Sequence, residues 1–213
     1  MRILFKTNYK QDLNLAKHGG HRFWYGLLIL VLFAAPLILG GYYIGEATRI
    51  LIYAMAGLGL MVLTGFTGQV SLGHAAFLAI GAYTNAWFLA QGFSSFVALP
   101  MAALLSMIGG LLVAIPAARM SGIYLAIATL AFAIIVEDFA GHLNSITGGN
   151  RGMMVDVPML FGYQIWESWE LYLFVLSILV AATLAVLNIL RSPLGRAMIA
   201  VRDSEVSSQA LGV

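Results

Sequence analysis

The feature that most constrains this chain is a series of long apolar runs that few charged residues interrupt. The first run extends from Phe23 to about Gly45, which is longer than the roughly 20 residues that a helix needs to cross the hydrocarbon core of a bilayer. Only 9% of the 213 residues are charged, against about 25% in soluble domains. Since such a chain cannot cover a surface that faces water, the sequence predicts a helical membrane protein.

The apolar runs predict an all-α fold, a polytopic membrane bundle of about six transmembrane helices. We expect these helices near residues 23–45, 50–66, 74–90, 97–118, 122–138 and 168–190. Pro36 is expected to kink the first of them. The chain then divides into a basic N-terminal arm (1–22), a transmembrane domain (23–190) and a C-terminal polar segment (191–213).

The distribution of basic residues predicts the orientation, because lysine and arginine concentrate in cytoplasmic loops. With the N-terminus in the cytoplasm, only Arg49 and Arg151 of the 11 lysine and arginine residues lie outside. The reversed orientation would place the other nine outside. We therefore expect a cytoplasmic N-terminus and a cytoplasmic 191–213 segment.

The second and third predicted helices are short and meet at the glycine-rich stretch 65–73. This stretch is either a tight turn at the membrane face or a broken helix inside the membrane. Non-helical backbone at membrane depth is tolerated only where protein buries it or where it lines a water-filled path. In the second interpretation Gln69, Ser71 and His74 would line such a path, although His74 could equally cap a helix end.

Two features lie at the predicted outer face. The loop 139–167 contains a turn at Thr147, Gly148 and Gly149, where glycines allow positive φ angles. The neighbouring acids Glu137 and Asp138 are interpreted as a solvated helix end. Since no acid lies at the centre of a predicted span, the sequence speaks against a proton- or sodium-coupled carrier.

The sequence also limits the chemistry that the chain can perform. It has no G-x-x-x-x-G-K-[ST] loop for nucleotide phosphates, so any ATP would be handled by another subunit. Cysteine is absent, which removes thiolate metal sites and cysteine nucleophiles. We expect no catalytic residue, no metal and no cofactor bound by this chain.

The segment 191–213 predicts two short helices with a bend near Asp203, which could cap the second helix. Its apolar residues form two separate stripes, and the segment carries Asp203 and Glu205 beside Arg196 and Arg202. A helix that lies on lipid is usually cleanly basic on its polar face. Docking to a protein partner is therefore favoured over docking to the membrane surface.

Four stretches together resemble a known family, the branched-chain amino acid ABC transporter permeases of the LivM type. They are TGFTGQVSLGHAAFLAIGAYTNA, PAARMSGIYLAIATLAFAIIVE, SITGGNRG and SPLGRAMIAVRDSEVSSQALGV. The resemblance extends from about Tyr25 to Val213. It implies an importer subunit in the bacterial inner membrane that is not an enzyme and is driven by ATP hydrolysed in partner subunits.

The resemblance also implies partners and residue roles. A periplasmic binding protein would dock at the outer loop with Thr147, Gly148 and Gly149, and a second permease subunit would complete the path. The ATP-binding subunits would contact a cytoplasmic coupling helix pair, in which the coupling residues are Gly195, Arg196, Arg202, Asp203 and Glu205. Family members continue with several more spans beyond this region, so the chain is expected to correspond to the N-terminal part of a longer permease.

Leucine, isoleucine and valine are the substrates that the resemblance implies. Related permeases handle urea, short amides or other amino acids, and composition cannot identify the substrate pocket because apolar residues occur throughout. The alternatives are a permease for such a related solute, an ion-coupled secondary carrier or a membrane scaffold that does not transport.

Overall fold

The computed structural model describes residues 19–120, 122–155, 158–160, 162–210 and 212. Most of the predicted basic arm at 1–22 lies outside these residues. Six long helices lie near the predicted spans, with different bounds for the first two, and the all-α membrane architecture is confirmed. They are α2 (Gly19–Ile38), α3 (Gly41–Met61), α4 (His74–Ala90), α5 (Ser95–Ala117), α6 (Ile123–His142) and α8 (Ser168–Arg191).

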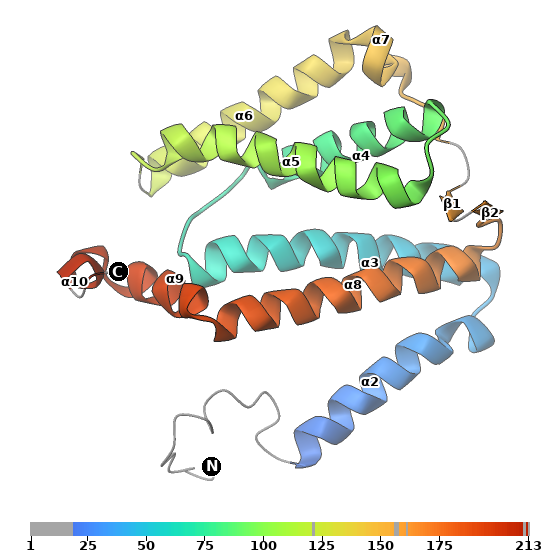
Figure 1. Ribbon diagram of the computed structural model, residues 1–213, viewed down its shortest axis with the longest axis horizontal. Coiled ribbons are helices and arrows are strands. Elements are labelled where there is room, and N and C mark those ends of the chain that lie inside the picture. Colours follow the sequence, from blue (N-terminus) through green and yellow to red (C-terminus); the bar gives the residue numbers. More distant parts are fainter. Residues whose placement is uncertain (1–18, 121, 156–157, 161, 211, 213) are drawn as a thin grey trace.

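The long helices form two layers, with α4, α5 and α6 in one and α2, α3 and α8 in the other (Figure 1). In the second layer α3 packs along α8 through a cluster of buried side chains, Ile44, Leu51, Tyr172 and Leu176. In the first layer α4 contacts both α5 and α6. The segment between α3 and α4 connects the two layers.

Four helical stretches are long and apolar enough to cross a membrane: Gly41–Phe66, Ser95–Ala117, Ile123–His142 and Ser168–Arg191. The apolar part of α2, Phe23–Ile38, is shorter, and α4 has 17 residues. Large apolar side chains such as Leu111, Leu112 and Ile115 are exposed on the outside of the bundle, as expected for surfaces that face lipid or another apolar helix.

The boundary between the first two helices differs from the prediction. The first helix was expected to kink at Pro36 and continue to residue 45, but α2 ends at Ile38 and α3 begins at Gly41. Pro36 cannot donate a hydrogen bond to the carbonyl of Leu32, and the helix ends two residues later, before Gly40. Hydropathy did not reveal this break because the residues on both sides of it are apolar.

The connection between α6 and α8, which the sequence placed at the outer face, contains more structure than a plain loop. It holds the short helix α7 (Asn144–Thr147), the 3-10 turn η2 (Gly149–Arg151) and an antiparallel pair of strands, β1 (Met159–Leu160) and β2 (Tyr163–Gln164). The sequence did not predict the strand pair. It is tied to the first turn of α8, since the hydroxyl of Tyr163 donates to Glu170 Oε1 at 2.6 Å.

The C-terminal segment forms two short helices as predicted, α9 (Pro193–Asp203) and α10 (Glu205–Ala210). The predicted cap is wrong by one residue, because Asp203 is the last residue of α9. Ser204 adopts the extended conformation between the helices, and its Oγ accepts a hydrogen bond from the amide of Ser207 at 3.3 Å. That geometry makes Ser204 the N-cap of α10.

Candidate functional site

The chain between α3 and α4 turns back into the bundle. The last turn of α3 widens into a π-helix, η1 (Val62–Phe66). The chain then runs without helical structure until α4 begins at His74, and there the imidazole Nε2 lies 3.0 Å from the carbonyl oxygen of Ala56. Ala56 is ten residues before Phe66, or about 15 Å along a helix. Residues 67–73, hereafter the re-entrant segment, thus extend well inside the length of α3, which favours the broken-helix interpretation over a tight turn.

Thr129 on α6 fixes the end of the re-entrant segment that leads into α4. Its hydroxyl oxygen accepts a hydrogen bond from the amide of Leu72 at 3.0 Å, while the same hydroxyl donates to the carbonyl of Ala126 at 2.9 Å. A Cβ atom on Gly73 would lie 2.1 Å from the carbonyl oxygen of Thr129. Only glycine therefore allows the segment to approach α6 this closely.

The re-entrant segment lines a cavity of about 390 Å³ between the two layers. The three predicted path residues Gln69, Ser71 and His74 all lie on this cavity, together with Thr129 from α6 and Met198 from α9. The other walls come mainly from small and apolar residues of α3 and α5. This combination of an apolar wall and a few polar groups is typical of small-molecule sites, but the role of the three residues in translocation stays a prediction.

His74 is held at the first turn of α4 by contacts with α3. A Cβ atom on Gly59 would lie 3.2 Å from His74 Nε2, so Gly59 leaves the space that the imidazole occupies. The other ring nitrogen, Nδ1, is buried and has no hydrogen-bond partner among the described residues. The function of Gly59 is thus to admit the histidine, which the sequence did not predict.

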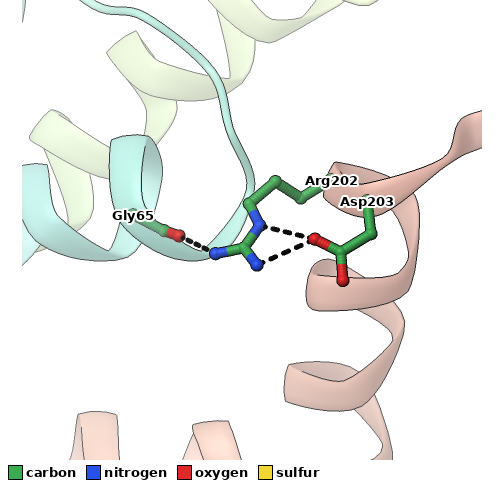
Figure 2. A network of polar contacts seen from close by, with 3 residues as sticks. All are labelled: Gly65, Arg202 and Asp203. Atoms are coloured by element: carbon green, nitrogen blue, oxygen red, sulfur yellow. Dashed lines mark hydrogen bonds and ion pairs between the residues drawn. The ribbon is translucent and has the colours of Figure 1, made fainter.

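Arg202 connects α9 to the end of η1 (Figure 2). Its Nη1 donates to the carbonyl oxygen of Gly65 at 2.7 Å, while Nε and Nη2 donate to Asp203 Oδ1 at 3.0 and 2.8 Å. The last carbonyls of a helix have no partner within it, and an arginine is well suited to bind them. Gly68, with φ +71°, packs on the aliphatic part of Arg202, where a Cβ atom would lie 2.7 Å from Cγ.

Of the other predicted coupling residues, Gly195 has the clearest structural role. A Cβ atom there would lie 2.4 Å from the carbonyl oxygen of Leu190, so glycine is required for the sharp turn between α8 and α9. The Nη1 of Arg196 donates to the carbonyl of Arg191 at 3.3 Å. The side chain of Glu205 lies outside the described part of the chain.

The predicted docking residues at the outer loop shape a turn. The hydroxyl of Thr147 is within hydrogen-bond distance of the carbonyls of Ala140 (2.6 Å) and Leu143 (2.7 Å), and its oxygen accepts from the amide of Gly149 at 3.2 Å. Thr147 and Gly149 are buried. They position the turn on α6, and docking of a partner there stays a prediction. In the described part of the chain no cluster of three or more histidine or acidic residues could hold a metal ion.

Two layers of apolar helices, a re-entrant break and a polar helix pair tied to that break define a multi-pass helical membrane protein. Residues 42–213 match the family model for the branched-chain amino acid transport system permease component. The chain belongs to this family.

Two relatives carry the name high-affinity branched-chain amino acid transport system permease protein LivM. The Salmonella typhimurium protein is 34% identical over 87% of this chain and 50% of its own length. The Escherichia coli protein is 34% identical over 90% of this chain and 51% of its own length. The chain thus spans about half the length of the curated relatives it matches. No solved structure matches it.

Proposed function

We propose that this chain is a membrane-spanning permease subunit of an ABC importer that moves branched-chain amino acids across the bacterial inner membrane. The observation that carries the proposal is the family match over residues 42–213, which includes both the re-entrant segment and the polar helix pair. Its N-terminus lies in the cytoplasm. The chain is not an enzyme and binds no cofactor, because ATP is hydrolysed by a partner subunit.

The proposed partners sit at opposite ends of the bundle. Cytoplasmic ATP-binding subunits dock on α9 and α10, where Leu194 (66% exposed), Val201 (43%) and Val206 (79%) leave apolar surface uncovered. A periplasmic binding protein docks over the Thr147–Gly149 turn, and a second permease subunit packs beside this one. These assignments rest on the family, and the exposed apolar residues of α9 and α10 support the first of them.

The proposed coupling route runs from α9 through Arg202 to Gly65. When ATP binding moves the partner subunits, α9 moves with them, and the hydrogen bond to Gly65 passes this motion to the re-entrant segment. Gln69 and Ser71 lie on that segment, so their cavity changes shape as ATP is used. The contact supports this route because it is a direct polar link between α9 and η1, and Leu63 and Thr67, two residues on either side of Gly65, line the cavity.

The first test is co-purification and uptake. The transporter that contains this chain is co-expressed with ATPase, partner permease and binding protein from the same source, purified in mild detergent and reconstituted in proteoliposomes. Association and ATP-dependent leucine uptake are expected. Uptake driven by an ion gradient without ATP would instead support a secondary carrier, and ATP-dependent uptake of urea or an amide but not leucine would change the substrate. Assembly without any uptake would contradict the proposal.

A further inference from the structure

A second cavity, of about 550 Å³, lies between α4, α6 and the turn at residues 149–152. It is separate from the re-entrant segment and Gln69, Ser71 and His74 do not line it. Alanines from both helices, including Ala79 and Ala133, form much of its wall, and residues 149–152 complete the lining. Its volume falls within the roughly 300–1,000 Å³ of small-molecule sites.

Two opposite charges line this one cavity, Glu137 from α6 and Arg151 from η2. Neither has an ion-pair partner within 4.0 Å in the part of the chain that the structure describes. Glu137 is five residues before the end of α6, about 7.5 Å along the helix, and acids inside a membrane helix generally face a cavity and serve function. The sequence had grouped Glu137 with Asp138 as a solvated helix end.

The structure separates the two acids. Asp138 does not line this cavity and lies 3.4 Å from His142 Nδ1. Both acids are exposed, but only Glu137 is on the cavity wall. Glu137 falls on the same face of α6 as Ala133, Ala140 and Gly141, at helical spacing of three to four residues, and all four line the cavity. Only Glu137 is thus in position to meet a ligand there.

The turn that carries Arg151 is fixed before any ligand arrives. Gly148 and Gly149 adopt φ angles of +74° and +60°, and a Cβ atom on Gly149 would lie 1.9 Å from Asn144 Oδ1. The buried Thr147 hydroxyl adds the hydrogen bonds to α6 described above. A rigid backbone at Arg151 lowers the entropy that binding would otherwise cost.

We propose that this cavity binds a zwitterionic α-amino acid, with Arg151 at the ligand carboxylate, Glu137 at its ammonium group and the alanine wall beside its side chain. A cation alone would leave Arg151 unpaired, and an anion alone would leave Glu137 unpaired, whereas a zwitterion matches both charges. A neutral solute such as urea matches neither charge. The inference rests on the proposed function and names a site where its substrate would bind.

The test uses the absence of native cysteine in this chain. Ala79→Cys places a single thiol in the cavity wall, and its reaction with a methanethiosulfonate reagent is followed in right-side-out vesicles that contain the complete transporter. The unmodified chain gives the background from partner subunits. Protection is titrated with leucine, with 4-methylpentanoate, which lacks the amine, and with 3-methylbutylamine, which lacks the carboxylate.

In the parent chain leucine is expected to protect at lower concentration than either analogue. Glu137→Gln and Arg151→Gln should each raise the leucine concentration for half-protection about tenfold or more, because each removes a charge-assisted hydrogen bond. Glu137→Gln should not weaken protection by 4-methylpentanoate, and Arg151→Gln should not weaken protection by 3-methylbutylamine, because neither analogue pairs with the charge that is removed. Asp138→Asn, next to Glu137 but outside the cavity, is the matched control and should change nothing.

Equal leucine protection in all three variants, or no protection in the parent chain, would overturn this inference. Neither outcome affects the proposed importer function, which the ATP-dependent uptake assay decides separately. Conversely, leucine protection that depends on both charges, in a transporter that takes up no amino acid, would leave the site standing and reject the function.

Discussion

At the residue scale, Tyr172 supplies the hydrogen-bond donor that Pro36 takes away from the carbonyl of Leu32. Pro36 has no amide hydrogen, so the carbonyl of Leu32 loses its usual helical donor. Tyr172 on α8 is 1% exposed, and its hydroxyl donates to that carbonyl at 2.9 Å. The hydrogen bond replaces the missing one and joins α2 to α8 across 140 residues of sequence.

This pairing predicts a non-additive effect of two substitutions. Tyr172→Phe should destabilise the protein by about 1 kcal/mol, because the Leu32 carbonyl is left without a donor. In a Pro36→Ala background residue 36 can donate to Leu32 itself, and Tyr172→Phe should cost clearly less. Thermal unfolding of the four variants in one detergent measures the interaction. Equal costs in the two backgrounds would mean that Tyr172 acts only through packing.

Gly73 predicts a second effect at this scale. In Gly73→Ala the new methyl group would overlap the backbone of Thr129, which α6 holds in place, so the re-entrant segment must shift. A loss of about 1–3 kcal/mol in stability and a fall in ATP-dependent uptake are expected. Gly57→Ala is the matched control, because nothing lies within 4 Å of its Cβ and alanine favours a helix. Similar behaviour of the two variants, in unfolding and in uptake, would contradict the assigned contact.

At the scale of elements, the relation between α9 and the re-entrant segment depends on one arginine. The Arg202–Asp203 pair is partly exposed (side chains 40% and 63%), and such pairs contribute little to stability. Arg202 is therefore more important as a link to Gly65 than as a source of stability.

Arg202→Ala is expected to leave assembly measurable while ATP hydrolysis continues with little transport. Asp203→Asn should also reduce coupling, but less, since it removes the carboxylate charge that helps to orient the guanidinium and keeps the donor to Gly65. The ratio of substrate taken up to ATP hydrolysed in proteoliposomes is the measurement. A normal ratio in both variants would refute the coupling role of this contact.

The elements differ in how well the sequence predicts them, for physical reasons. The bounds of α4 were predicted correctly, because Gly73 and Gln91 interrupt the apolar run on both sides. The break at Gly40 was missed because the residues beside it, such as Leu39 and Tyr42, are as apolar as residues inside a membrane helix. The direction of the re-entrant segment depends on Thr129, 57 residues beyond Leu72, and no local pattern contains that contact.

The same reasoning applies to the candidate sites. Gln69, Ser71 and His74 were found because polar groups are rare in apolar runs, and the structure brings them to one cavity. Gly59, Met198 and the separation of Glu137 from Asp138 depend on how helices face one another. Weak amphipathicity in a mostly apolar chain conceals those faces, so the second cavity could be located only from the structure.

At the scale of the whole molecule, the features described above lie at two ends. The helices α9 and α10 and the exit from η1 lie at one end, and the Thr147–Gly152 turn and the strand pair lie at the other (Figure 1). The long helices run back and forth between these ends. The proposed cytoplasmic N-terminus would put α9 inside the cell and the turn outside.

This arrangement predicts the labelling of two single-cysteine variants. An impermeant thiol reagent added to intact cells should react with Asn150→Cys and not with Ala200→Cys, and the pattern should reverse in inside-out vesicles. The chain has no cysteine of its own, so the unmodified chain reports the background. Reaction of both positions from one side would overturn the proposed topology.

The π-helix η1 has a consequence for the length of chain available at the break. The amide of Thr67 donates to the carbonyl of Val62, five residues earlier. In an α-helix the corresponding separation is four residues. Arg202 holds Gly65 within η1, and Thr129 holds the far end of the re-entrant segment through its hydrogen bond with Leu72. Rewinding η1 as an α-helix of the same length would release one residue, about 3.5 Å of slack. The chain from η1 to residue 73 can thus lengthen or shorten while every long helix keeps its position against its neighbours.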